Sequence, residues 1–317
     1  MIRELTPIRF ALCMMIFAHH AFSYAAGGAP AVAAFFMLSG FCMTLGYKDK
    51  IISGSIIYID YLKARLARIY PIHWITFIAF FLITLYTGDA VINKRMMLSN
   101  FLLLQSWIPE RSFYFSYNAI AWYLSTALFA YLCFPMIIHF LNKITCQQRV
   151  CLLAVMLVAY GAVAYAMPQS DYHAMLYINP ACRCIDFIIG IYLAEWFSRI
   201  EANRLQKYGW VFDMGLIISF AMLNVVSFCL TKDMRSVSAF FWLPSAALIL
   251  CASLSSKLES PLSKLLRSII IQKSTACSFS LMMWSVFAIQ LCKGLDVPNT
   301  LMGGGNFNLR SVCCSAD

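Results

Sequence analysis

The sequence predicts an all-α polytopic membrane protein, a bundle of about nine transmembrane helices with one short re-entrant or interfacial segment. Of its 317 residues, 62% are hydrophobic and only 12% are charged, and the mean hydropathy is +0.74. Soluble domains carry about a quarter charged residues, and a soluble globule of this composition would expose large apolar patches to water. The apolar residues also form continuous runs instead of alternating with polar ones, which excludes a transmembrane barrel.

A helix needs about 20 apolar residues to cross about 30 Å of hydrocarbon. The stretch Met96–Trp107 is about twelve residues long, so we expect it to be re-entrant or interfacial. The run Ile185–Phe197 is also short, and we expect it to begin within the preceding loop. The nine predicted spans are Pro7–Ala26, Ala29–Tyr47, Ile69–Thr87, Ala119–Leu141, Val150–Met167, Ile185–Phe197, Trp210–Leu230, Val237–Leu254 and Ala276–Cys292.

The net charge of +10 comes from basic residues in the short gaps between these runs. Such charges set topology and do not indicate a nucleic-acid partner, because basic loops stay on the cytoplasmic side during insertion. With the N-terminus inside, fifteen Lys and Arg residues lie on the cytoplasmic side and eight on the other. The sequence therefore predicts a multi-pass protein of the lipid bilayer with a cytoplasmic N-terminus.

The chain shows no internal repeat, long linker or soluble appendage, so we expect one integral-membrane domain over residues 1–317. Residues 293–317, with a run of three Gly at Gly303–Gly305, form an atypical polar tail with no closing helix, as in a truncated chain. The 13 Cys residues show neither a CxxC pair nor metal-ligand spacing. They are expected to be small buried apolar side chains, and no metal site is predicted.

The first predicted span carries the two most informative polar residues, Arg9 and His20. Eleven residues of helix amount to three turns plus about 20°, so both side chains project from one face, separated by about 16 Å. An ionisable residue inside a span costs a few kcal/mol and is a functional candidate by default. The alternative is structural, with Arg9 reaching the inner interface and His20 binding a neighbouring backbone.

Polar groups farther along the chain each allow two interpretations. The cations Lys63, Arg65 and Arg68 beside the third span can meet anionic lipid, hold a phosphorylated molecule, or serve as positive-inside charge alone. Ser39-Gly40, small residues in a bulky run, favour close helix packing. Four residues are candidates for the acceptor side of a site or for structural roles: Trp122, Ser125, Arg183 and Asp186, the last two spaced for an ion pair.

Taken together, these motifs resemble the acyltransferase-3 family of bacterial membrane-bound O-acyltransferases. The likeness covers about residues 5 to 290, and six weak motifs in order make it specific. Arg9 and His20 match an Arg-x10-His pair. The other matching segments are Phe35–Phe41 (FFxLSGF), Lys63–Pro71 (a basic loop ending in R-I-x-P), Trp122–Tyr131 with Phe134-Pro135, Arg183–Gly190 and Ser278–Trp284.

The resemblance implies transfer of an acyl group, commonly acetyl from acetyl-CoA, to a hydroxyl of a surface polysaccharide or a lipid-linked precursor. Arg9 and His20 would be the essential pair, and Lys63, Arg65 and Arg68 would face the CoA donor, with no bound cofactor. A neutral imidazole could act as general base or carry the acyl group itself. The 16 Å offset favours Arg9 as the group that positions the donor. The resemblance also implies a bacterial inner membrane.

The sequence departs from the family pattern at four positions and lacks the last helix. Ala127 stands where the family has an acidic residue, Tyr123 replaces a Ser, Ser285 replaces a His, and Lys63 replaces the first basic residue of R-x-R. Lysine does not reproduce a bidentate guanidinium. These departures leave two other interpretations open: an inactive or truncated family member, and a transporter or flippase, since intramembrane Arg and His also line transport pathways.

Overall fold

The computed structural model describes residues 2–22, 27–87, 93–201, 205–275, 280 and 283–284, and in this part of the chain it contains helices and no strands. The short helical turns are η1 (Gln105–Trp107), η2 (Gln169–Asp171), η3 (His173–Ile178, a π-helix), η5 (Gln206–Tyr208) and η6 (Met234–Ser236). The α-helices are α1 (Leu5–Phe22), α2 (Gly28–Ile52), α3 (Tyr58–Thr87), α4 (Lys94–Phe101), α5 (Arg111–Tyr114), α6 (Ala121–Lys143), α7 (Cys146–Ala166), α8 (Pro180–Arg199), α9 (Gly209–Cys229), α10 (Ala239–Lys257), α11 (Pro261–Leu266) and α12 (Ile269–Thr275).

Seven of these helices, α1, α2, α3, α6, α7, α9 and α10, are long and apolar enough to cross a membrane. An eighth crossing is formed if the segment Gln169–Ile178 and α8, which meet at a bend of 55°, are counted as one span. The all-helical membrane fold is confirmed, whereas the predicted number of nine spans is not. The predicted span Ala276–Cys292 and the tail 293–317 lie almost wholly outside the described residues.

One predicted boundary differs from the structure, and the expected earlier start of the helix at Ile185–Phe197 is confirmed. The third crossing helix begins at Tyr58 and not at Ile69, because residues 58–68 are rich in Leu, Lys, Ala and Arg, which favour helix even where they are too polar for a membrane. The predicted basic loop is therefore the first three turns of α3. The helix predicted at Ile185–Phe197 begins at Pro180, where Asn179 caps it by accepting from Ala181 N–H at 2.9 Å.

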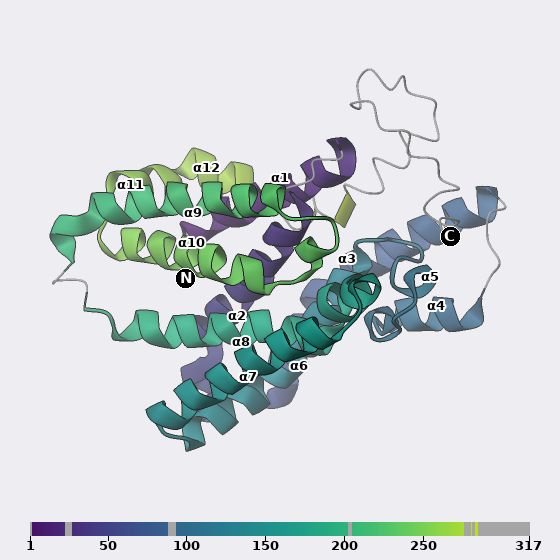
Figure 1. Ribbon diagram of the computed structural model, residues 1–317, viewed down its shortest axis with the longest axis horizontal. Helices are drawn as coiled ribbons and strands as arrows, with labels where there is room; N and C mark the ends of the chain where they lie inside the picture. The colour runs from purple at the N-terminus through teal and green to yellow at the C-terminus, as the bar shows by residue number, and fades with distance from the viewer. Residues whose placement is uncertain are drawn as a thin grey trace.

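The segment Met96–Trp107 does not cross, as predicted. It forms the eight-residue α4, which Asn93 caps by accepting from Arg95 N–H at 2.9 Å, and the turn η1. Figure 1 shows α4 and α5 together at one end of the molecule, beside the C-terminal end of α3. We call residues 93–120 the cap segment. It connects two antiparallel crossing helices, α3 and α6, that pack against each other.

The centre of the bundle is the crossing of α2 and α8, where small residues let two backbones touch. A methyl group added at Gly40 would lie 2.0 Å from the carbonyl oxygen of Phe187, and one added at Gly190 would lie 1.9 Å from that of Met37. This confirms the packing role predicted for Gly40. Around this crossing, α1, α6 and α10 cover α2, while α9 packs on α10.

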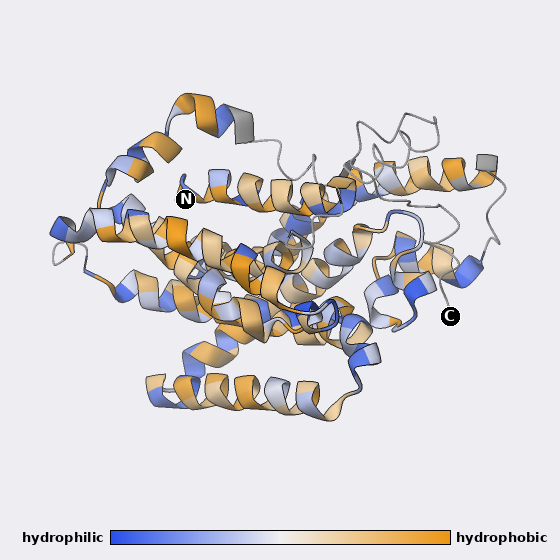
Figure 2. Ribbon diagram, turned by 45° about the horizontal axis from the view of Figure 1, so that its top comes forward, coloured by the Kyte–Doolittle hydropathy of each residue, from blue (hydrophilic) through white to orange (hydrophobic). Residues whose placement is uncertain are grey.

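Polar contacts gather the ends of successive helices on one side of the bundle. Glu195 at the end of α8 accepts from Lys48 of α2 at 2.6 Å and from Arg149 of α7 at 2.8 Å. Glu4, just before α1, pairs with Arg267 beyond α11. Figure 2 shows apolar residues along the helices and hydrophilic ones concentrated towards their ends. The chain therefore alternates in direction from α1 to α10, with the cap segment on the opposite side.

Candidate functional site

One stripe of α1 carries both predicted catalytic residues. Arg9, Cys13, Ile16 and His20 follow the i, i+4, i+7, i+11 spacing of a single helix face. Cys13 is 2% exposed and Ile16 is 5% exposed, while Arg9 and His20 at the two ends of the stripe are half-buried. The stripe therefore faces protein and not lipid. Because α1 is helical from Leu5 to Phe22, Arg9 and His20 project from the same face of the helix.

The charge of Arg9 acts on the same two groups as the charge of a second arginine, Arg68 of α3. The guanidinium of Arg9 interacts with the thiol of Cys42 on α2, and the charges of Arg9 and Arg68 both act on Cys42 and on the Tyr123 hydroxyl of α6. Among the described residues, neither arginine takes part in an ion pair. Two guanidinium groups from different helices thus act on the same thiol and hydroxyl, and neither has a carboxylate partner in the described part of the chain.

Hydroxyl groups of α2, α3 and α6 take part in hydrogen bonds near these residues. Ser39 of α2 and Tyr131 of α6 are joined by a hydrogen bond of 3.1 Å between their side-chain oxygens. Tyr61, at the start of α3, donates to the carbonyl oxygen of Tyr131 at 2.8 Å, which fixes α3 on α6. We call Arg9, Ser39, Cys42, Arg68, Tyr123 and Tyr131 the two-arginine cluster.

The two-arginine cluster is partly open. Arg9, Ser39 and Cys42 are half-buried and Arg68 is exposed, although α2 is otherwise the most buried of the crossing helices. Ser39 and Cys42 are three residues apart and share a face of α2. A charged side chain in a membrane bundle faces a partner or water, so the half-buried Arg9 and the exposed Arg68 mark the polar side of this cluster.

Ala127 lies on the α6 face that carries Tyr123 and Tyr131, four residues from each. It is 4% exposed. The resemblance to the acyltransferase-3 family places an acidic residue at this position. In this chain that departure removes a carboxylate from the side of α6 that faces the two arginines.

The three predicted donor-binding cations do not lie on one face of α3. Relative to Lys63, Arg65 is turned by about 200° and Arg68 by about 140°. Lys63 is exposed and meets only Asp60, at 4.0 Å, among the described residues. Arg65 donates to the Tyr47 hydroxyl of α2 at 2.6 Å and stacks on its ring at 4.8 Å. Of the three, Arg68 is the one whose charge acts together with that of Arg9 on Cys42 and Tyr123.

His20 occupies the last full turn of α1, at the other end of the stripe from Arg9. Its ring lies 5.2 Å from that of His19, edge to face. The ring of His19 packs over Gly28, the first residue of α2, where an added methyl group would lie 3.0 Å from His19 Cδ2. The α1–α2 connection thus fixes His19, and His20 projects about 100° away from it.

Trp122 and Ser125 lie on the face of α6 that the cap segment covers. The Trp122 carbonyl oxygen accepts from Ser106 of η1 at 2.8 Å, and its ring packs on Tyr177 of η3 at 5.0 Å. Ser125 is 1% exposed, and its hydroxyl oxygen has no hydrogen-bond partner in the described structure. The two residues lie one helical turn apart but differ in their contacts. Trp122 is held by a hydrogen bond and a ring contact, whereas the Ser125 hydroxyl has no hydrogen-bond partner among the described residues.

Arg183 and Asp186 form a buried ion pair of 2.8 Å within α8, 1% and 0% exposed. Ser238 binds Arg183 at 2.6 Å, and Trp242 donates to the second carboxylate oxygen at 2.6 Å. The Tyr177 carbonyl oxygen accepts from Arg183 Nε at 2.7 Å. Both the Arg183 guanidinium and the Asp186 carboxylate therefore have partners. Because these partners come from η3, α8 and α10, the ion pair is a structural link that joins the three elements.

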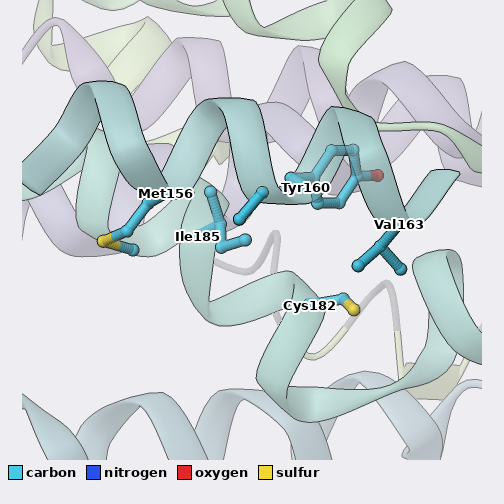
Figure 3. A pocket seen from close by; sticks show the side chains of 6 residues that line it. Met156, Tyr160, Val163, Cys182 and Ile185 are labelled. Carbon is cyan, nitrogen blue, oxygen red and sulfur yellow. The ribbon is translucent and has the colours of Figure 1, made fainter. Parts of the chain in front are cut away.

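A cavity of about 220 Å³ lies between α7 and α8. Figure 3 shows Met156, Tyr160 and Val163 of α7 on one side and Cys182 and Ile185 of α8 on the other. Its lining is almost wholly apolar, and none of the predicted site residues lines it. The cavity is therefore not where an anionic donor would be held.

Sequence reasoning missed Cys42 as a member of the two-arginine cluster, and it treated Tyr123 only as a departure. A signal was present in the spacing of Ser39 and Cys42, two small polar residues on one face of an apolar helix. The shared influence of Arg9 and Arg68 on Cys42 and Tyr123 had no such signal, because these residues come from four different helices and are brought into range only when the bundle is assembled.

The fold and the site define a polytopic helical membrane protein with two arginines, Arg9 and Arg68, that make no ion pair within the described residues. A family model described as an acyltransferase domain matches residues 2–308, so the chain belongs to the acyltransferase-3 family. It is similar to the Acyltransferase MdmB of Streptomyces mycarofaciens, with 26% identity over 242 residues. The aligned part is 70% of this chain and 58% of that protein, so the chain spans less than two thirds of its relative. No solved structure matches the chain.

Proposed function

We propose that this protein is an acyltransferase that moves an acetyl or other acyl group from acyl-CoA to a hydroxyl of a surface polysaccharide or its lipid-linked precursor. Membership of the acyltransferase-3 family supports acyl transfer as the reaction. The proposed setting is a bacterial inner membrane, with the gathered helix ends and the N-terminus on the cytoplasmic side. The excess of basic residues on that side supports this orientation.

The observation that carries the choice of donor is the two-arginine cluster. CoA is strongly anionic through its phosphates, and guanidinium groups bind phosphate with paired, charge-assisted hydrogen bonds. Arg9 and Arg68 have no ion-pair partner among the described residues, and Arg68 is exposed. In the proposed complex they take the donor phosphates, while Arg65 holds α3 on α2 through Tyr47.

The proposed chemistry assigns the proton transfer to His20. Its neutral imidazole takes the proton of the acceptor hydroxyl as the oxygen attacks the thioester carbonyl. The new C–O ester bond forms, the C–S bond breaks, and the CoA sulfur leaves as the thiol after receiving a proton. The rise of about 16 Å from Arg9 to His20 along α1 matches an extended donor, held at its phosphates by one end of the helix and reacting at the other.

The test uses membranes that contain the protein and acetyl-CoA labelled in its acetyl group. We expect labelled acetyl to appear in ester linkage on material from those membranes, and both Arg9→Ala and His20→Ala to abolish the transfer. Loss of a general base lowers rates by about 100- to 10,000-fold. His139→Ala is the matched control, because His139 is exposed at the far end of α6.

The outcomes separate the three interpretations. Label transfer that survives His20→Ala contradicts the proposed role of His20. Binding of acetyl-CoA without transfer in the wild-type protein supports an inactive family member, which the missing carboxylate at Ala127 would explain. Movement of a glycan across the bilayer without acylation supports a transporter.

A further inference from the structure

Unpaired polar atoms collect at one junction of the fold, where α3, α6 and the cap segment meet. Buried side-chain nitrogen and oxygen atoms are normally hydrogen-bonded, and each one without a partner costs free energy. In the described structure, such atoms at this junction are His73 Nδ1, both amide atoms of Gln105, and Ser125 Oγ. His73 and Gln105 are 0% exposed and Ser125 is 1% exposed.

The cap segment places η1, the turn that begins with Gln105, over the α6 face that carries Ser125. Ser106 of η1 donates to the Trp122 carbonyl oxygen at 2.8 Å, and the ring of Trp107 packs edge-on against Phe129 at 4.8 Å. Trp122, Ser125 and Phe129 follow the i, i+3, i+7 spacing of one α6 face. Since η1 contacts that face on both sides of Ser125, Ser125 lies beneath the turn that begins with Gln105.

His73 reaches the same junction from α3. Its Nε2 lies 2.9 Å from the carbonyl oxygen of Asn100, in the last turns of α4. A carbonyl oxygen only accepts, so Nε2 carries the proton, and in the neutral ring Nδ1 is left as a hydrogen-bond acceptor. The backbone leads from Asn100 through Leu103 directly into η1.

The backbone of the cap segment is strained at this place. Leu103 has a φ of 57° and Tyr117 has a φ of 56°, in the left-handed region that side chains other than Gly rarely adopt. Leu103 is also 1% exposed, two residues before Gln105. Strained non-glycine residues persist where the surrounding structure holds them, and they are concentrated at ligand sites.

We propose that His73, Gln105 and Ser125 form a binding site for a neutral, hydroxyl-bearing molecule, the acceptor of the acyl group. A hydroxyl both donates and accepts, which matches one ring acceptor, one amide donor, one amide acceptor and one serine hydroxyl. The three side chains carry no net charge in this state, so they suit neither an anion nor a cation. The site lies with the cap segment, on the side opposite the gathered helix ends. The identification of the ligand as the acceptor rests on the proposed function.

Two variants and one matched control test the site. Gln105→Met and Ser125→Ala remove the unpaired atoms with little change of shape. Ser245→Ala is the control, because Ser245 of α10 is also buried with an unpaired hydroxyl but lies outside the junction. Each protein is placed in nanodiscs, and its unfolding temperature is measured with methyl α-glucopyranoside, N-acetylglucosamine or glycerol.

We expect at least one of these hydroxylated probes to raise the unfolding temperature of the wild type and of Ser245→Ala, and to have a much smaller effect on Gln105→Met. Without probe, Gln105→Met should unfold at the wild-type temperature or above it, because it no longer buries an unpaired amide. In the transfer assay, Gln105→Met and Ser125→Ala should raise the KM for acceptor by about 10-fold or more and leave the KM for acetyl-CoA unchanged.

Two results would overturn the site: no stabilisation of the wild type by any probe, or equal stabilisation of all four proteins. Failure of the proposed function is recognised separately, since acetyl-CoA would then neither stabilise the wild type nor label any acceptor. The probe measurements need no acyl transfer and stay decisive in that case.

Discussion

Arg68 and Lys63 make the clearest contrast between neighbouring cations. Both are exposed and occur in the basic stretch that the sequence associates with a phosphorylated donor. The charge of Arg68 acts on Cys42 and Tyr123 together with that of Arg9, whereas Lys63 pairs with Asp60. We expect Arg68→Ala to raise the KM for acetyl-CoA by about 10- to 100-fold, the loss of a charge-assisted hydrogen bond. Lys63→Ala should change it by less than about 3-fold, as an exposed ion pair does. Equal effects of the two substitutions would contradict this division.

The buried pair of Arg183 and Asp186 gives a prediction about stability. Asp186→Ala would leave the Arg183 guanidinium buried without its carboxylate, and breaking such a pair costs about 3–5 kcal/mol of folding free energy. We expect a large fall in the unfolding temperature of the detergent-solubilised protein. The double variant Arg183→Met with Asp186→Leu should recover much of that loss, because no charge remains buried. A single variant as stable as the wild type would show that the pair is not a structural link.

Some of the site residues can be recognised from the sequence alone, and others cannot. Arg9 and His20 could be found from one helix, since their spacing fixes a shared face. Cys42 and Gln105 could not, because their significance depends on neighbours distant in sequence. An uncharged Gln in a short turn looks ordinary until its burial and its lack of a partner are known.

At the scale of elements, the crossing of α2 and α8 depends on two glycines. Gly190→Ala would place a methyl group 1.9 Å from the Met37 carbonyl oxygen and force the two backbones apart. Overpacking of this kind costs about 1–3 kcal/mol or more, and we expect a lower unfolding temperature and less folded protein in the membrane. Gly161→Ala in α7 is the matched control, because nothing lies within 4 Å of its added methyl group. The control should be neutral or stabilising, since Ala favours helix by about 1 kcal/mol over Gly.

The boundaries of α3 and α8 show what hydropathy alone misses. Both helices extend beyond their apolar stretches, α3 to Tyr58 and α8 to Pro180. Hydropathy measures which residues tolerate lipid, whereas a helix continues as long as its backbone is capped or its residues favour it. The consequence is functional, because a helical Lys63–Arg68 segment must divide its three charges among different faces.

At the scale of the whole molecule, a polar contact joins the N-terminal end of the chain to the segment around α11. Glu4 accepts from Ser263 and pairs with Arg267, which also donates to the Ser256 carbonyl oxygen at 2.7 Å. Burial by itself raises the pKa of Glu4, but the hydrogen bonds from Ser263, the backbone and Arg267 outweigh it and hold the pKa below the ordinary value of 4.5. The contact thus joins the start of α1 to the segment after α10.

This contact predicts an acid-dependent loss of stability. A carboxyl group with a lowered folded-state pKa stabilises the fold above its unfolded value of about 4.5, and the contribution is lost as the pH falls through the folded-state value. We expect the wild-type unfolding temperature to fall as the pH drops below about 4.5, and the fall to be smaller in Glu4→Gln. Glu259→Gln is the control, because Glu259 is 70% exposed and lies 3.8 Å from Arg267. If both variants keep the full wild-type pH dependence, the contact does not govern it.

The sequence by itself determined the class of protein, the positions of seven crossing helices, the short segment that does not cross, and the register of Arg9 with His20. These follow from composition and local periodicity, which a single helix expresses without its neighbours. Only the tertiary structure decided that the charge of Arg68, and not that of Lys63, acts with Arg9 on Cys42 and Tyr123. It also decided that Arg183 and Asp186 pair with each other, and that Gln105 is buried with no hydrogen-bond partner among the described residues. The physical reason is that these properties belong to spaces between helices, and such spaces exist only after the helices have packed.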